Sequence, residues 1–544
     1  MLVRLRHEDS TVCHATIEAA HALMSACTSC KRADQFPALS ATGRGCFVGR
    51  RGGSRAGMDH SEAPVLDALA AYHRRGEVPF TPPGHKQGRG ADPRVLAVLG
   101  EDVFRSDVLA TAGLDDRRSS AGLLQRAELL MADAVGAEQT FFSTCGSSLS
   151  VKAAMLAVAG PDEKLLVGRD AHKSVISGLI LAGIRPIWVE PAWDPYLHLA
   201  HPPSAAAFAD KLEAHPDARG ALVTSPTPYG TCADLAAIAG VCHARGRPLI
   251  TDEAWGAHLP FHDGLPAWAM NAGADVCVTS VHKMGAGLEQ SSVFHLQGDL
   301  VDPAVLQASA DLLGTTSPSV LIYAAVDGWR RQMAEHGHQL LDSALQLGRL
   351  TRAQIERIEG IHIGGEKDFV GPGKAAEFDP LQLIIDISGL GIDGYHAADW
   401  LRDQHHIDLH VSDHRRASAQ LSYADDDQTA HTLISALTDL ASRAATLSPA
   451  AKVEVPDPKD LRLELARLPS DAFFARTEQV PTGQAVGRIA AEMLTPYPPG
   501  IPAAVPGERL TRPVLDYLRS GVQAGMVIPD AADTTLDSVR VVAE

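Results

Sequence analysis

Residues 248–255 are Pro-Leu-Ile-Thr-Asp-Glu-Ala-Trp, and residues 276–283 are Val-Cys-Val-Thr-Ser-Val-His-Lys. In each stretch a short run of apolar and β-branched residues, which is typical of a buried strand, leads directly into polar side chains. Three more short apolar runs precede them, at residues 164–167, 186–189 and 221–224. Because stretches of helical pattern separate most of these runs, the sequence predicts βαβ units and a mostly parallel sheet.

The polar residues that follow the strands carry the chemistry. In an open parallel sheet the ligand lies beyond the carboxyl ends of the strands, and here those ends lead into His172, Asp252, Ser280 and Lys283. A buried acid can keep a heteroaromatic nitrogen protonated, and a lysine can form a Schiff base with an aldehyde; pyridoxal phosphate needs both groups. Taken singly, Asp252 could be a helix cap or half of an ion pair, and Lys283 a solvated lysine. Their joint position favours a cofactor site.

A turn earlier in the chain adds a candidate phosphate site. Cys145-Gly146-Ser147-Ser148 opens an apolar helix that we expect over residues 149–159. The free backbone N–H groups and hydroxyls of such a turn can bind an anion, although the same pattern is also an ordinary helix N-cap. The turn therefore supports a cofactor site only together with the strand-end residues.

These residues belong to a series of motifs that resembles the Orn/Lys/Arg decarboxylase family, the bacterial basic-amino-acid decarboxylases of the aspartate-aminotransferase class. The series spans roughly residues 60–510 in family order. Ser-Val-His-Lys at 280–283 and Pro-Tyr-Pro-Pro-Gly-Ile-Pro at 496–502 match patterns specific to this family within its class, whereas the Asp–Lys pair alone does not. The other matching segments are 81–88, 144–148, 171–174, 225–227, 252–258 and 506–508.

The resemblance implies an α/β protein with the fold of the pyridoxal-phosphate-dependent transferases of fold type I. Such a protein has a large domain with a mostly parallel seven-stranded sheet, a smaller α/β domain and a C-terminal module. The expected boundaries are 58–345 for the cofactor-binding large domain, 346–448 for the small domain, 449–459 for a linker and 460–544 for the C-terminal decarboxylase module.

The resemblance also implies roles around the cofactor, pyridoxal 5'-phosphate. Lys283 is expected to bind it covalently, Asp252 to pair with its ring nitrogen, and His172 to stack on its ring. His172 and Lys283 are the candidate proton donors. The residues expected to hold the phosphate are Ser147, Ser148, Ser280 and His282. No metal is expected in the site.

Three further residues are expected to complete the site. Thr316, in a Thr-Ser-Pro segment, is expected to reach the cofactor from the partner subunit. Glu508, in Pro-Gly-Glu, is placed to meet the distal cation of the substrate. Trp255 is expected to contact the substrate, although packing beside the site is an alternative. One departure concerns the phosphate turn, where Cys145 stands in place of the family's usual Asn.

The activity implied is the decarboxylation of a basic amino acid (arginine, lysine or ornithine) to the corresponding amine and carbon dioxide, with a role in polyamine biosynthesis. The sequence does not decide between the three substrates. One alternative is another fold type I enzyme, such as an aminotransferase or a decarboxylase that also oxidises. A second alternative is a non-catalytic protein that only binds the cofactor.

Composition excludes other classes of protein. The formal net charge of −18 argues against nucleic-acid binding and against docking on an anionic membrane. No uncharged apolar run is long enough to span a bilayer, and eight cysteines in 544 residues are too few for a disulfide scaffold. We therefore expect a cytoplasmic protein that acts on a small molecule.

The first 57 residues differ from the rest in composition. They hold eight Lys or Arg residues against four acids, and four of the eight cysteines. Cys27 and Cys30 form a CxxC pair for which a zinc site is conceivable, but without a second pair a disordered extension is the simpler interpretation. The family's decamers are built by a large wing domain that this segment does not resemble. We therefore expect a homodimer or a dimer of dimers, with the active site at the subunit interface.

Overall fold

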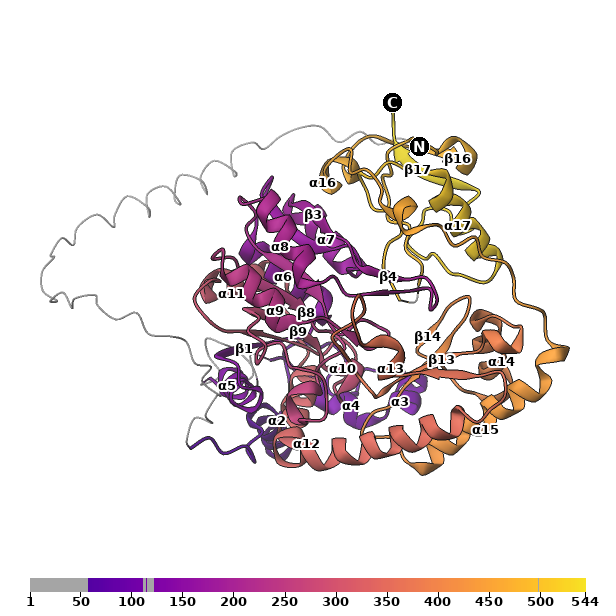
Figure 1. The fold of residues 1–544 in the computed structure, drawn as a ribbon. Helices are drawn as coiled ribbons and strands as arrows, with labels where there is room; N and C mark the ends of the chain where they lie inside the picture. The colour runs from indigo at the N-terminus through magenta and orange to yellow at the C-terminus, as the bar shows by residue number, and fades with distance from the viewer. Residues whose placement is uncertain (1–56, 111–113, 115–121, 498) are drawn as a thin grey trace, which may run out of the picture. The chain divides into compact units, whose positions relative to one another are not determined.

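A computed structural model describes residues 57–110, 114, 122–497 and 499–544 (Figure 1). The interpretations of residues 1–56, including the Cys27–Cys30 pair, lie outside the described residues. The central feature is a seven-stranded sheet in the order β1-β10-β9-β8-β6-β2-β3. Its strands are β1 (Gln139–Ser143), β10 (Ser292–Leu296), β9 (Val276–Ser280), β8 (Leu249–Asp252), β6 (Ala221–Thr224), β2 (Lys164–Gly168) and β3 (Arg185–Val189).

The strands from β9 to β3 run parallel to one another, which confirms the expected mostly parallel sheet. Each of the five apolar runs is a strand, with its bounds within one residue of the expectation. The antiparallel strand β10 and its neighbour β1 were not expected, because polar residues interrupt their apolar pattern. These polar groups are satisfied inside the protein: Thr140 Oγ1 lies 2.9 Å from His295 Nδ1, and Ser292 Oγ lies 2.9 Å from Ser150 Oγ.

Helices cover both faces of this sheet, which explains why its strands are apolar along their whole length. Side chains alternate between the faces: Leu166 and Val223 pack into one core cluster, whereas Leu165 and Leu222 pack into another. The second cluster includes α6 (Gly146–Val158), α7 (Lys173–Ala182) and α11 (Pro303–Leu313). The first includes α2 (Pro64–Arg75), α5 (Leu123–Val135), α9 (Leu235–His243) and α12 (Val320–Ile355).

A single helix of 36 residues, α12, leads from the large sheet to a smaller one. The pattern of residues 319–357 predicts more than one long helix, but a single helix forms, which packs against α2 at one end and α15 (Asp427–Arg443) at the other. The smaller sheet has the order β11-β13-β15-β14 and packs with α14 (Gly394–His405). Its strands are β11 (His362–Gly364), β13 (Gln382–Asp386), β15 (Ala417–Gln420) and β14 (Val411–Ser412).

The pattern of residues 407–411, Ile-Asp-Leu-His-Val, predicts a strand, but this prediction is wrong for most of its length because only Val411 belongs to β14. His406 ends the preceding helix in the left-handed conformation (φ 56°), and the chain then passes through irregular backbone before it pairs with β15. The C-terminal part, after residue 460, has its own apolar cluster around α17 (Arg512–Gln523). It also pairs β16 (Thr477–Pro481) with β17 (Ser538–Val542).

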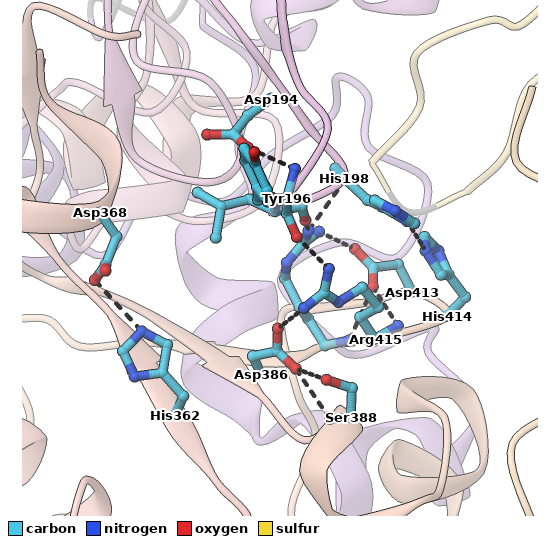
Figure 2. A network of polar contacts seen from close by, with 12 residues as sticks. Asp194, Tyr196, His198, His362, Asp368, Asp386, Ser388, Asp413, His414 and Arg415 are labelled. Carbon is cyan, nitrogen blue, oxygen red and sulfur yellow. Dashed lines mark hydrogen bonds and ion pairs between the residues drawn. The ribbon is translucent and has the colours of Figure 1, made fainter. Parts of the chain in front are cut away.

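A hairpin that follows β3 joins the large sheet to the small one. It consists of β4 (Ala192–Asp194) and β5 (Leu199–His201), and polar contacts surround its tip (Figure 2). Arg415 Nη1 donates to the carbonyl of Tyr196 at 2.6 Å, and its Nη2 pairs with Asp386 at 2.7 Å. His198 Nδ1 lies 3.1 Å from His414 Nε2, so one ring donates and the other accepts. These contacts hold the hairpin against the small sheet.

Histidines in and near this contact make the stability of the protein depend on pH. Burial lowers the pKa of His201 and of His410 to about 4, and burial followed by nearby arginines lowers the pKa of His198. Below pH 6.5 these histidines therefore bind fewer protons in the folded chain than in the unfolded chain, so their contribution to the free energy of unfolding falls with acidification. A fully buried histidine contributes at most about 1.4 kcal/mol per pH unit to this fall.

We expect urea unfolding to show a continuous loss of stability from pH 6.5 toward pH 4. His201→Gln should flatten that dependence, because the amide has no proton to gain. The exposed His336 offers a control, and His336→Gln should leave the slope unchanged. Stability that stays constant or increases on acidification would contradict the prediction.

Candidate active site

Three of the expected residues lie where two neighbouring parallel strands end. Asp252 is the last residue of β8, Ser280 is the last residue of β9, and Lys283 follows in the short helix α10 (Val281–Met284). The strands pair in a register that sets Asp252 opposite Val278. The charges of Lys283 and Asp252 interact: burial lowers the pKa of Lys283 to about 8, and the carboxylate of Asp252 opposes that shift.

Asp252 is suited to hold a positive charge in a dry environment. It is 4 % exposed, and burial raises the pKa of its carboxyl, while Lys283 and the Ala254 amide act in the opposite direction. The Ala254 N–H donates to one carboxylate oxygen at 3.3 Å. A buried carboxylate gains most from a protonated partner, because the partner offsets the cost of its desolvation. A pyridinium nitrogen is such a partner.

His172 caps the N-terminus of α7 and is held in one orientation. Its Nδ1 accepts the Ser174 N–H at 3.2 Å, and burial, followed by the charges of Lys283 and Lys173, lowers its pKa to about 4. The ring packs against Gly500, which has φ +89° and where an added Cβ would lie 3.0 Å from two ring atoms. Glycine at this position lets the C-terminal segment support the neutral imidazole.

The phosphate turn opens α6. Ser147 and Ser148 lie in the first helical turn, and the Gly146 N–H is already taken by the Gln290 carbonyl at 2.9 Å. The Ser280 hydroxyl is buried and has no hydrogen-bond partner among the described residues. A buried unpaired hydroxyl costs free energy, so a bound phosphate oxygen would satisfy it. His282 uses its Nδ1 to donate to the Ser291 carbonyl at 3.0 Å.

A pocket of about 350 Å³ contains the lysine, and aromatic side chains form part of its wall. Lys283 Nζ lies 4.0 Å from the centroid of the Trp255 ring, and the Trp255 and His410 rings meet edge to face at 4.5 Å. Residues that the sequence did not point to also line this pocket, namely Glu289, Asp408, Leu409, His410, Ala419 and Gln420. Glu289 comes from the loop after α10, whereas the others come from the irregular segment before β14 and from β15, which no local pattern links to Lys283.

Two expected site residues lie elsewhere in this chain. Thr316 is exposed, in a segment between α11 and α12. Glu508 is fully buried, and its carboxylate pairs with Arg169 at 3.0 Å and accepts the Val505 N–H at 3.0 Å. Arg169 directly follows β2 and also donates to the Pro502 carbonyl at 2.8 Å. Within the chain, Glu508 therefore joins the C-terminal part to the large sheet, and its contact with a substrate remains a prediction.

Glu508→Gln should accordingly reduce stability. The change leaves the Arg169 guanidinium 10 % exposed without its counter-charge, and breaking a buried pair in this way costs about 3–5 kcal/mol. Chemical denaturation of the single variant and of Arg169→Met/Glu508→Gln would measure the coupling. If Glu508→Gln kept full stability and raised KM only for cationic substrates, the substrate contact would be favoured instead.

Solved structures identify the class of protein. Constitutive lysine decarboxylase of Escherichia coli superposes with a TM-score of 0.73 at 20% identity, over 89% of this chain and 82% of that one. Ureidoglycine–glyoxylate aminotransferase of Bacillus subtilis gives a TM-score of 0.51 at 14% identity, over 65% and 91%. The fold is that of the pyridoxal-phosphate-dependent enzymes of fold type I.

Sequence comparisons then identify the family. Residues 63–371 match the model of the Orn/Lys/Arg decarboxylase major domain, and residues 463–530 match that of the family's C-terminal domain. Arginine decarboxylase of Bacillus anthracis is 37% identical over 490 residues, 90% of this chain and 98% of that protein. A lysine decarboxylase of Pseudomonas aeruginosa is 27% identical, over 84% and 75%. The chain belongs to the Orn/Lys/Arg decarboxylase family, and the expected class of enzyme, an amino acid decarboxylase, is confirmed.

Among the described residues, no helix combines the length and the apolar character needed to cross a membrane.

Proposed function

We propose that this protein is a pyridoxal-phosphate-dependent decarboxylase that converts arginine to carbon dioxide and the corresponding amine. The observation that carries the proposal is the pair of buried, oppositely charged groups, Lys283 and Asp252, which follow adjacent parallel strands and interact electrostatically. Arginine is favoured over lysine because the relative named for arginine is the more similar and is matched over almost its whole length.

The residues present fit the cofactor. Lys283 would bind its aldehyde carbon, Asp252 its ring nitrogen, and the neutral His172 ring would lie on its ring face. Its phosphate would be held by the first turn of α6, at Ser147 and Ser148, and by the unpaired hydroxyl of Ser280, with His282 alongside. Pyridoxal phosphate bound there supplies the electron sink that the loss of a carboxylate from Cα requires.

The side chains of the site have separate roles in the reaction. With a pKa of about 8, the Lys283 amine lies close enough to neutral pH to attack a carbonyl when deprotonated and to deliver a proton to Cα when protonated. His172, with a pKa of about 4, stays neutral and positions the reacting groups. The Trp255 and His410 rings exclude water from one side of the Lys283 amine.

We also propose that the enzyme is a homodimer or a dimer of dimers. The exposed Thr316 segment supports this arrangement, since a partner subunit could use it to complete the neighbouring site. Light scattering of a fully active sample that gives the mass of a monomer would contradict it. A cytoplasmic location and a role in polyamine biosynthesis stay predictions.

The test is incubation of the purified protein and cofactor with arginine, lysine and ornithine, with products identified by mass spectrometry. We expect equal amounts of carbon dioxide and amine, fastest from arginine. A 2-oxo acid would indicate an aminotransferase, and an aldehyde would indicate a decarboxylase that oxidises. Bound cofactor without turnover of any of the three would indicate a non-catalytic protein.

A further inference from the structure

The mouth of the Lys283 pocket carries two acidic side chains. Apart from Lys283 itself and two histidines, the charged residues that line the pocket are Glu289 and Asp408. Their side chains are 91% and 87% exposed, so both carboxylates are in contact with water in the single chain. The pocket thus has an amine at its base and two carboxylates at its rim.

Each carboxylate is held near the pocket by its own loop. Glu289 precedes Gln290, whose carbonyl accepts the Gly146 N–H at 2.9 Å and so ties the loop to the first turn of α6. A carboxylate oxygen of Glu289 lies 3.8 Å from His282 Nε2, and its charge raises the pKa of Lys283. Glu289 therefore acts electrostatically on the reacting amine.

Asp408 lies in the irregular segment after α14. Arg402 Nε donates to Asp408 Oδ1 at 3.2 Å, and Arg402 Nη1 donates to Asp399 at 2.8 Å. The same guanidinium thus contacts two acids, of which only Asp408 lines the pocket. This arrangement provides a matched control, because Asp399 can be changed without altering the pocket wall.

The wall of the pocket contains a third acceptor. Gln420 Nε2 donates to the Lys283 carbonyl at 2.9 Å, which fixes the amide. Its Oε1 is buried and has no hydrogen-bond partner among the described residues. A buried amide oxygen without a donor costs free energy, so a ligand that carries N–H groups would satisfy it. Gln420 lines the same pocket as the two carboxylates.

We propose that Glu289 and Asp408 bind the distal cation of the substrate, with the Gln420 amide oxygen accepting one of its N–H groups. The inference rests on the proposed function, because it requires a basic amino acid as substrate. It places substrate selection at the rim of this pocket, where Asp408 stays exposed beside Arg402, whereas Glu508 is fully buried in its pair with Arg169. The two carboxylates suit a guanidinium, which carries N–H donors on more than one side.

The test compares a cation with a neutral molecule of the same shape. KM is measured for arginine, and citrulline, which carries a urea group in place of the guanidinium, is measured as a competitive inhibitor. The variants are Glu289→Gln, Asp408→Asn, the double variant and the control Asp399→Asn. All replaced side chains are exposed, so the fold should be retained, and the absorption of the bound cofactor checks this.

We expect KM for arginine to rise about fivefold in each single variant and about twentyfold in the double variant, as suits ion pairs that remain in contact with water. The inhibition constant of citrulline should change by less than about threefold in all of them, and Asp399→Asn should behave as wild type. Added salt should raise KM of the wild type but not that of the double variant.

The outcomes separate the inference from the proposed function. If the wild type decarboxylates none of the basic amino acids, the proposed function fails. If the wild type is active but the double variant binds arginine as well as before, the inference is overturned. Equal weakening of arginine and citrulline also overturns it, because the two acids would then shape the pocket without binding the cation.

Discussion

Lys283→Ala should reduce decarboxylation by about 10³-fold or more, since proton transfer by a positioned side chain alone contributes about 10²–10⁴-fold and the covalent attachment is lost with it. The effect should be this large because Lys283 Nζ is the amine at the base of the pocket, next to Asp252 and over the Trp255 ring. The purified wild type should be yellow, and borohydride should fix the cofactor on the peptide that contains Lys283.

Lys164→Ala is the control for this experiment. Lys164 begins β2, at the end of the strand remote from the site, and pairs with Asp217 at the surface. The control should keep both the borohydride-reducible link and wild-type turnover. If borohydride attaches the cofactor to a different lysine in the wild type, the assignment of Lys283 is wrong.

Asp252→Asn should lower kcat by about 10²-fold or more while the protein stays folded. A neutral amide cannot stabilise a protonated ring nitrogen, and each pKa unit lost from that nitrogen corresponds to about 1.4 kcal/mol. Stability should change little, because burial already raises the pKa of Asp252 and the amide removes a desolvated charge. Steady-state kinetics and thermal unfolding of the same sample measure the two effects separately.

Asp275→Asn is a control for which we expect the reverse result, a loss of stability without a loss of turnover. Asp275 is also a buried acid beside the large sheet, but it lies before β9 and accepts the Leu249 N–H and contacts His243, both at 2.8 Å. Its replacement should reduce stability and leave kcat close to wild type. Turnover by Asp252→Asn within a few-fold of wild type would show that the ring nitrogen is held by another group.

Most of the large sheet could be predicted because its strands are recognisable locally. Runs such as 221–224 are apolar throughout, a pattern that a doubly covered parallel strand requires, and longer helical stretches such as 234–245 separate most of them. The strands β1 and β10 escaped prediction because Thr140, Ser292 and His295 find partners only in the folded protein, across the sheet or in α6. The residues at 407–411 have the composition of a strand, but only Val411 has a partner strand.

The candidate site likewise has one part that the sequence predicts and another that only the structure shows. Asp252, Ser280 and Lys283 follow strands that the sequence shows directly, and parallel strands bring their carboxyl ends to one edge of the sheet. Motif order alone was enough to recognise the family, which the comparisons confirm. Local patterns and their order along the chain therefore determined both the fold class and the residues that follow the parallel strands.

Only the tertiary structure decided which distant groups meet. Arg169 and Glu508 are 339 residues apart, and nothing in either segment indicates that their charges cancel in a buried contact. Likewise, Glu289 and Asp408 come from separate parts of the chain and share a pocket because the small sheet packs beside α10. A strand or helix follows from the periodicity of its own residues, whereas a pairing between side chains depends on where the whole chain places them. The sequence therefore determined which residues follow the parallel strands, and the tertiary structure decided which acids line the same pocket as Lys283.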